Sequence, residues 1–405
     1  MSHPDYERIP EVLDAIHEDE LLSLLKDMLR LPSFSRSRAE ADLAVFLEDY
    51  LREMGLDVRR QVVEDDRSNV IAVMKGRGGG RSLIFNGHMD VNPPAEGWSK
   101  DPFGGEIEDG YIYGIGAVNM KAGDAAFMIA AGAVKRMGVD LRGDVILSLV
   151  VGELQGGIGT IRMLEEGVTA DAFIVAEPTD LHLLIRHMGM VHVKFTVIGR
   201  SCHISSKEKG LNAIEYMYRV LEEIEGRSEG PAGRLYERMN IGSIQGGLTQ
   251  DFQTWRPSLV ADYCQATCDF RIPPGQTEAR LITGLERLAL EIQARTPGLE
   301  IKAELVRPPL YYHMPPYETD EREPIVQTVM AGHHHITGTP AKLADFPPYT
   351  YYASDAAHLS NRAGIPGVVY GPGGTTVSQP DERVRVADIM TAARVYAHSI
   401  LNFCS

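Results

Sequence analysis

The chain has 405 residues, of which 44% are hydrophobic and 24% are charged, which is an ordinary globular composition with enough length for two domains. Its formal net charge of −16 would repel a nucleic acid, so that class of partner is excluded. The four cysteines are scattered, so we expect reduced thiols and no disulfide framework. The sequence shows no apolar leader and no uninterrupted run of 18 apolar residues, which predicts a cytoplasmic protein that does not span a membrane.

The first part of the chain alternates between helical and strand patterns. Helical spacing of apolar residues, or an alanine-rich composition, predicts helices at residues 21–31, 39–54 and 120–137. Short apolar runs predict buried strands at residues 70–74, 82–85, 144–151 and 172–176. This alternation is typical of an α/β layer built on a mixed or parallel sheet.

From Gly189 the pattern changes to that of a small α+β domain. Strands are expected at residues 191–198, 241–245, 259–270 and 300–306, and helices at 212–225 and 277–294. After residue 308 the α/β pattern resumes, with helices expected at 355–363 and 386–401 and a strand at 367–370. The sequence therefore predicts a discontinuous α/β domain, 1–188 and 305–405, interrupted by an inserted α+β domain, 189–304.

Two motifs carry side chains that are common in metal sites. His88 and Asp90 are two residues apart directly after a strand, where the imidazole can bind a metal and the carboxylate can fix its tautomer. A plain turn at the strand end is the alternative interpretation. Asn119 lies between a glycine-rich loop and the long helix, where its oxygen can cap the helix or bind a metal, and the cap is favoured.

Two glutamates follow predicted buried strands. Glu153 stands between a very apolar strand and a run of glycines, where burial would raise its pKa and suit it to be a general base. A solvated loop glutamate is the alternative. Glu177 follows the next strand, in the motif Ala-Glu-Pro-Thr.

The motifs together resemble those of the di-zinc family of acetylornithine deacetylase, succinyl-diaminopimelate desuccinylase, aminoacylase and carboxypeptidase G. They are Gly-His-Met-Asp-Val at 87–91, Asp-Pro-Phe at 101–103, the segments 113–121, 210–215 and 271–277, Glu-Pro-Thr at 177–179 and Gly-Pro-Gly at 371–373. The resemblance covers the chain from about Leu21 to the C-terminus. It implies a zinc-peptidase-like catalytic domain with an inserted lid that usually also mediates dimerisation, and hence a homodimer or higher homo-oligomer.

The resemblance also implies a metal site with fewer ligands than usual. One metal of the family takes residues that correspond to His88, Asn119 and Glu177. In the family, the position of Asn119 is an aspartate that bridges to a second metal. The second metal adds a glutamate and a late histidine, which correspond to Leu154 and to Ser378 or Gln379. Leucine cannot bind a metal and serine is a poor neutral ligand, so one divalent transition ion per chain is expected, with manganese or zinc favoured.

The remaining family residues have counterparts in the chain. Glu153 corresponds to the general base and Asp90 to the carboxylate behind the metal ligand. His203 corresponds to a lid histidine that stabilises the developing oxyanion, often from the partner subunit. Arg271 lies in a motif whose arginine binds a substrate carboxylate, and a structural ion pair is the equal alternative for it.

Three functions follow from these motifs. The first is a metal-dependent hydrolase that cleaves a C–N bond in a small carboxylate-bearing substrate, with Glu153 as general base. The second is a hydrolytic deaminase of an amino-aromatic acid, resembling nitroanthranilate aminohydrolase, in which Tyr351 and Tyr352 line a pocket for a planar substrate, although ordinary packing of these tyrosines is favoured. The third is a catalytically silent binding or scaffold protein.

Overall fold

The protein divides into two units. The computed structural model describes residues 8–226, 229–230, 233–252, 257–308, 311–346, 348–374 and 376–405. The first unit joins the chain up to residue 186 with residues 317–405, and the second is the continuous stretch 187–316. The second unit thus extends beyond residue 304, where the sequence pattern predicts its end, because Met314 still pairs with Met190 of that unit.

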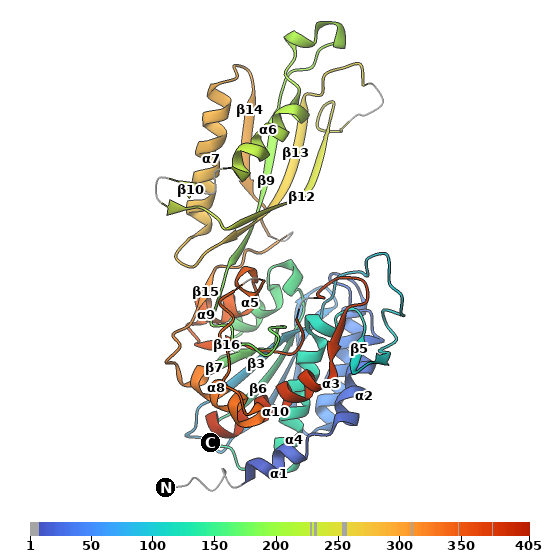
Figure 1. Cartoon of the computed structure of the whole chain (residues 1–405), viewed down its shortest axis with the longest axis vertical. Coiled ribbons are helices and arrows are strands. Elements are labelled where there is room, and N and C mark those ends of the chain that lie inside the picture. Colours follow the sequence, from blue (N-terminus) through green and yellow to red (C-terminus); the bar gives the residue numbers. More distant parts are fainter. Residues whose placement is uncertain are drawn as a thin grey trace. The chain divides into compact units, whose positions relative to one another are not determined.

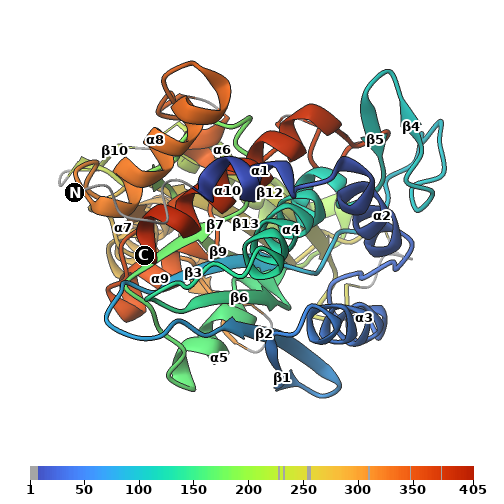
Figure 2. The same cartoon turned by 90° about the horizontal axis from the view of Figure 1, so that it is seen from below.

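A mixed sheet forms the middle of the first unit (Figures 1 and 2). Its strands, in spatial order, are β1 (Asp57–Glu64), β2 (Arg67–Met74), β6 (Val145–Val150), β3 (Leu83–His88), β7 (Ala172–Val175) and β16 (Gly367–Val369). β2 is antiparallel to β1 and to β6, whereas β6, β3, β7 and β16 run parallel. The predicted α/β layer on a mixed sheet is therefore confirmed.

Helices cover both faces of this sheet. Figure 2 shows α4 (Ala122–Arg136) and α10 (Val386–Phe403) on one side and α5 (Ile158–Glu165) on the other. The remaining helices of the unit are α1 (Ile9–Asp14), α2 (Glu18–Leu29), α3 (Ala39–Glu53), α8 (Pro324–Thr337) and α9 (Ala356–Ala363). None of the helices in the described ranges is long and apolar enough to cross a membrane.

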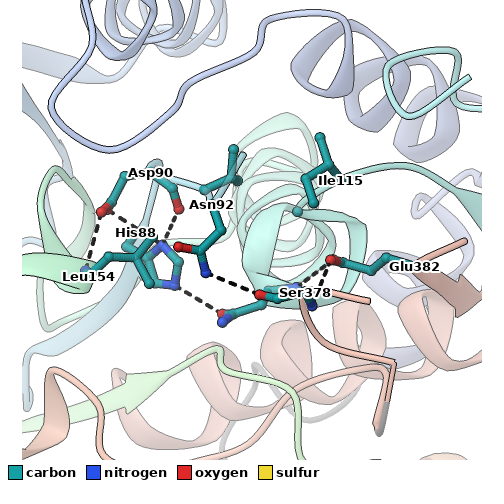
Figure 3. A pocket seen from close by; sticks show the side chains of 10 residues that line it. His88, Asp90, Asn92, Ile115, Leu154, Ser378 and Glu382 are labelled. Carbon is teal, nitrogen blue, oxygen red and sulfur yellow. Dashed lines mark hydrogen bonds and ion pairs between the residues drawn. The ribbon is translucent and has the colours of Figure 1, made fainter. Parts of the chain in front are cut away.

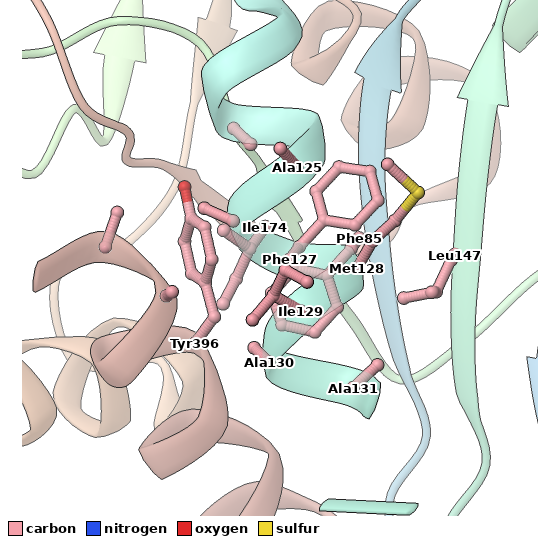
Figure 4. Close-up of a cluster of buried hydrophobic side chains, with 14 of the residues drawn as sticks. Phe85, Ala125, Phe127, Met128, Ile129, Ala130, Ala131, Leu147, Ile174 and Tyr396 are labelled. Carbon is pink, nitrogen blue, oxygen red and sulfur yellow. The ribbon is translucent and has the colours of Figure 1, made fainter. Parts of the chain in front are cut away.

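The two faces of β3 have different surroundings. Leu83 and Phe85 belong to the core that contains α4 and α10, whereas Ile84 belongs to a second core that contains residues of α5 and α9. Side chains alternate along a strand, so Gly87 lies on the face of Phe85 and His88 on the face of Ile84. Figure 4 shows Phe85 against Phe127 and Tyr396, with ring centroids 5.7 and 5.3 Å apart.

The second unit is a four-stranded antiparallel sheet with two helices. The strands lie in the order β12 (Arg238–Gly247), β13 (Tyr263–Ile272), β9 (Gly189–Ile198) and β14 (Glu300–Leu305). The helices α6 (Ala213–Glu225) and α7 (Glu278–Ala294) share a hydrophobic core with the buried side chains of β9, β13 and β14. Alternate residues of β13 are buried, as expected for a sheet covered on one face.

Short elements complete the two units. In the first unit, β17 (Arg383–Arg385), β5 (Tyr111–Tyr113) and β4 (Ile107–Glu108) form a small sheet. The chain passes between the units near β8 (Arg186–His187) and β15 (Tyr317–Glu318), and the second unit also contains β10 (Glu229–Gly230) and β11 (Gly233–Arg234). Short helical segments are formed by Ala117–Lys121, Glu153–Gln155, Ile204–Lys209 and Tyr349–Tyr351, and the first and third of these contain non-helical residues.

The packing of Phe85 gives the first testable prediction. Phe85→Ala removes a fully buried ring and should lower the free energy of unfolding by about 3–5 kcal/mol, because a cavity remains where the ring was. Val62→Ala is the control, since Val62 is 60% exposed and its loss should change stability by less than about 0.5 kcal/mol. Equilibrium denaturation measures both, and equal stabilities of the two variants would contradict the assignment of Phe85 to the core.

Candidate functional site

Three neighbouring parallel strands place three polar side chains at one edge of the sheet. His88 ends β3, Glu153 follows β6 by three residues, and Glu177 follows β7 by two. Because β3 lies between β6 and β7, the carboxyl ends of these strands meet at the same edge, which is where α/β sheets usually bind ligands. One nitrogen or oxygen atom from each of the three buried side chains lies within 4.8 Å of the others, as in a metal site.

The imidazole of His88 is held through its Nδ1 atom. Nδ1 lies 2.8 Å from the backbone oxygen of Asp90 and 3.6 Å from its carboxylate. With a proton on Nδ1 donated to the carbonyl, Nε2 keeps its lone pair for a ligand. The Asp90 carboxylate accepts hydrogen bonds from the backbone of Glu153 and Leu154, at 3.1 and 3.2 Å. Asp90 therefore links the histidine to the loop that carries the expected base.

The Nε2 atom of His88 faces three oxygen atoms. They belong to the amide of Asn119, at 3.0 Å, and to the carboxylates of Glu177 and Glu153, at 3.5 and 4.0 Å. In the described part of the chain, neither carboxylate makes an ion pair with a lysine or an arginine. A nitrogen and several oxygens with no lysine or arginine paired to them suit a divalent transition ion, so these residues fit the expected metal.

The interpretation of Asn119 as a helix cap is wrong. The chain leaves the helical conformation at Asn119, with φ −121° and ψ 93°, and its peptide bond to Met120 is cis. α4 begins only at Ala122, after Lys121. The amide oxygen of Asn119 is thus directed at His88 rather than at the first turn of α4.

The charges at this edge of the sheet are strongly coupled. Burial raises the pKa of Glu153 well above its ordinary value, and the charges of Glu177, Asp355 and Asp90 raise it further, against the opposing effect of His88. Burial lowers the pKa of His88, but Glu177, Glu153 and Asp90 together raise it well above its ordinary value. The cluster therefore holds protons tightly, and a divalent cation can take the place of that positive charge. The solvated-loop alternative for Glu153 is wrong, because the residue is only 6% exposed.

A small cavity adjoins His88 where the resemblance places a second metal (Figure 3). It is narrow, and Leu154, Asn92 and Ser378 line it together with Asn119. The Asn92 amide donates to the Ser378 hydroxyl at 3.1 Å. Ser378 and Gln379 are the two candidates for the position of the late family histidine, and of these Ser378 is the one that lines the cavity. Besides His88 and Asp90, the side chains that line it are apolar or neutral, apart from Glu382, whose oxygens accept backbone hydrogen bonds.

Two buried carboxyls near the site carry no recognisable sequence motif. Asp124 of α4 lies directly beneath β3, since a Cβ atom at Gly87 would come within 1.8 Å of its Oδ1. A lone carboxyl in the otherwise apolar segment of α4 is the signal that could have identified Asp124. Asp355 precedes α9, and a Cβ atom at Gly157 would lie 2.5 Å from its Oδ1. Asp355 had no such signal, because only the fold brings it to the glycines after Glu153.

The other expected residues lie outside this cluster or at its margin. His203 and Arg271 belong to the second unit, where His203 binds Ser205 and Arg271 forms an ion pair with Asp269 at 2.8 Å. This ion pair is the structural alternative for Arg271, and the catalytic and substrate roles of both residues stay predictions. Tyr352 lies near Glu177, since burial and the charges of Glu177 and Asp180 raise its pKa above the ordinary value. Tyr351, in the preceding helical turn, is half-buried.

Known proteins are similar to this chain in sequence and in fold. The family model for Peptidase family M20/M25/M40 matches residues 84–402. The chain is 31% identical to a succinyl-diaminopimelate desuccinylase of Cereibacter sphaeroides, over 94% of this chain and 98% of the relative. It is 27% identical to an N-formyl-4-amino-5-aminomethyl-2-methylpyrimidine deformylase of Halalkalibacterium halodurans, over 96% and 95%. A tripeptidase structure from Staphylococcus aureus has a TM-score of 0.78 at 20% identity and covers 96% of this chain and 99% of its own.

Asp355 gives a prediction on pH and stability. Burial raises its pKa to about 7, so the folded, metal-free protein binds this proton more tightly than the unfolded chain. The bound proton of Asp355 stabilises the fold fully at pH values below the pKa of Asp355 in the unfolded chain, which is near 4. This stabilisation is lost as the pH rises to about 7. Asp355→Asn should therefore match wild type near pH 4 and exceed it by roughly 1–4 kcal/mol at pH 8.

Denaturant unfolding of metal-free protein across this pH range measures the effect. Asp140→Asn is the control, because the Asp140 side chain is 72% exposed and its replacement should give no gain that grows with pH. A variant at Asp355 that is less stable than wild type at pH 8 would show that the buried carboxyl is stabilised in its ionised form.

Proposed function

Because the chain belongs to Peptidase family M20/M25/M40, a family of hydrolases, we propose that it is a metal-dependent hydrolase that cleaves a C–N bond in a small carboxylate-bearing substrate. The family assignment made from the sequence motifs is confirmed by the match over residues 84–402. The observation that carries the proposal is the arrangement at His88, whose Nε2 faces Asn119, Glu177 and Glu153 while its Nδ1 is held by Asp90.

His88, Asn119 and Glu177 would hold the ion. When bound, the ion supplies Lewis-acid activation of water and of the scissile carbonyl. Glu153 accepts the proton of the water and delivers it to the leaving nitrogen, a role that suits a buried carboxyl with a raised pKa. Asp90 orients both groups, since its carbonyl fixes His88 and its carboxylate fixes the backbone of Glu153. His203 stabilises the oxyanion and Arg271 binds the substrate carboxylate in this proposal.

Three neutral residues support one ion per chain rather than two. Leu154 offers no ligand atom, Ser378 offers only a neutral hydroxyl, and Asn119 offers an uncharged amide oxygen where a bridging aspartate would serve two ions. Two adjacent divalent ions need several carboxylates between and around them, whereas one ion is balanced by Glu177 and Glu153. Mixed nitrogen and oxygen ligands suit zinc or manganese.

The substrate is expected to be either an N-acyl amino acid or an amino-aromatic acid. The desuccinylase and deformylase among the relatives are named for removing an acyl group from nitrogen, which supports cleavage of an amide. The place of Tyr352 near Glu177, with its ring 5.8 Å from that of Tyr349, supports a planar substrate and therefore the deaminase as the second candidate. A silent binding or scaffold protein is the third, and it requires that Glu153 can be replaced without loss of function.

The second unit supports a homodimer. β12 is an edge strand in the described sheet, and its Ile241 and Ile244 are 43% and 54% exposed. Ile214 and Tyr218 of α6 are 42% and 66% exposed. Exposed apolar side chains on a helix, together with an edge strand free to pair, are typical of an interface with a second copy. The four free cysteines support a cytoplasmic location.

Glu153→Gln tests the reaction. The variant should still bind its metal but lose a factor of roughly 10²–10⁴ in kcat, because the amide cannot accept the proton of water. The assay measures release of formate, acetate or succinate from N-acyl amino acids and release of ammonia from aminobenzoates, which separates the hydrolase from the deaminase. Glu166→Gln is the matched control, since Glu166 is a half-exposed residue at the end of α5 with arginine partners. Undiminished turnover in Glu153→Gln would favour the third candidate over both enzymes.

Metal analysis tests the number of ions. Wild-type protein saturated with zinc or manganese and freed of excess should carry about one ion per chain. A triple variant with Asn119→Asp, Leu154→Glu and Ser378→His restores three ligands of the family pattern and should bring the content to about two. Elemental analysis after gel filtration gives both numbers. A wild-type content of two ions, or of none at saturating metal, would contradict the single-ion site.

A further inference from the structure

The buried carboxylate of Glu382 is hydrogen-bonded to two loops beside the cavity, one that contains Asn119 and one that contains Ser378. Its Oε1 accepts hydrogen bonds from the backbone of Val118 at 2.8 Å and of Asn119 at 3.3 Å, and its Oε2 accepts one from Ser378 at 3.0 Å. The residue is 1% exposed. Glu382 therefore spans from the loop that carries a metal ligand to the C-terminal segment 376–382.

The same segment also contacts the chain just after His88. The Ser378 hydroxyl accepts a hydrogen bond from Asn92, which stands four residues after His88 and two after Asp90. Figure 3 shows this series of contacts from Asn92 through Ser378 to Glu382 along one side of the cavity. The segment 376–382 thus bridges the two stretches of chain that carry His88 and Asn119.

This bridge lies where a second ion would otherwise join the same stretches. In the expected family pattern, a histidine at the position of Ser378 and an aspartate at the position of Asn119 meet on one ion. Here the backbone N–H groups of Ser378 and Asn119 are joined through the carboxylate of Glu382 instead, while the Ser378 hydroxyl accepts a hydrogen bond from Asn92. The side chains of both departures also make direct contacts, Ser378 with Asn92 and Asn119 with His88.

We propose that Asn92, Ser378 and Glu382 are positioning residues that hold Asn119 against His88 and so replace the second ion as the link between the C-terminal segment and the metal site. The inference rests on the proposed single-ion site. In this proposal Asn119 stays in place although the family ligands at Leu154 and Ser378 are lost. Hydrogen bonds from the backbone to the buried carboxylate of Glu382 hold the loop that carries its amide oxygen.

The contacts of Thr376 provide a matched control within the same segment. The Thr376 hydroxyl exchanges hydrogen bonds with the backbone of Arg383, at 3.2 and 3.4 Å, and so links the segment to the start of β17. Thr376→Val removes this hydroxyl without touching either metal-bearing stretch. Ser378→Ala removes a hydroxyl two residues away that does touch one.

The experiment measures zinc affinity by competition with a chromophoric chelator. Ser378→Ala, Asn92→Ala and Glu382→Gln should each raise the Kd for zinc by roughly 10–100-fold while the content at saturation stays near one ion, as is typical when a residue behind a metal ligand is lost. Thr376→Val should stay within about twofold of wild type. Because Asn92 and Ser378 act through one hydrogen bond, the double variant should be no weaker than the worse single one.

Hydrogen exchange of the metal-free proteins gives a readout that does not depend on the ion. Peptides that cover residues 116–120 should exchange faster in Ser378→Ala and Glu382→Gln than in wild type or Thr376→Val. Unchanged zinc affinity together with unchanged exchange would overturn the inference, and the two smaller variants, Ser378→Ala and Asn92→Ala, decide the matter if Glu382→Gln does not fold. Wild-type protein that binds no zinc would refute the proposed function, while faster exchange in the variants would still support the positioning role.

Discussion

The candidate site depends on the buried charges that meet at one edge of the sheet in the first unit. Parallel pairing of β6, β3 and β7 brings Glu153, His88 and Glu177 together because the three strands end at the same edge. Burial there makes ionised carboxylates costly, and the only cationic partner of Glu153 and Glu177 among the described ion pairs is His88. The cluster is therefore stable either when it retains protons or when a cation occupies it, and in the proposed metal site this alternative couples folding to pH and to metal binding.

Much of this edge can be predicted from the sequence. The apolar runs that become β3, β6 and β7 are evident, and the residues that follow them are the ones that the fold brings together. Two other elements of the first unit lack such signals. β1 is a largely exposed edge strand with polar residues, and α5 is a short helix that begins after two glycines, so neither shows a clear apolar period.

The contacts that complete the site depend on distant parts of the chain. Asn119 has the sequence context of a cap, and only the break in the helical conformation turns its oxygen toward His88. Asp355 and Glu382 lie more than 200 residues after His88 in the sequence and reach the site through α9 and the small sheet that includes β17. Local patterns carry no information on such contacts, because they are set by how the C-terminal segments return to the sheet.

Charge balance accounts for an uncharged amide at residue 119 in a chain that also has Leu154 and Ser378 in place of two family ligands. Burial raises the pKa of Glu382 to about 7 and that of Asp124 well above its ordinary value, so the surroundings of His88 already contain carboxyls that ionise reluctantly. With one divalent ion, Glu177 and Glu153 supply two negative charges, and a third carboxylate at residue 119 would leave an excess buried charge. An amide keeps the ligand oxygen without that charge, and its own backbone N–H then helps to hold Glu382. In the proposed site for one ion, asparagine at residue 119 thus balances the charge, whereas it would weaken a site for two ions.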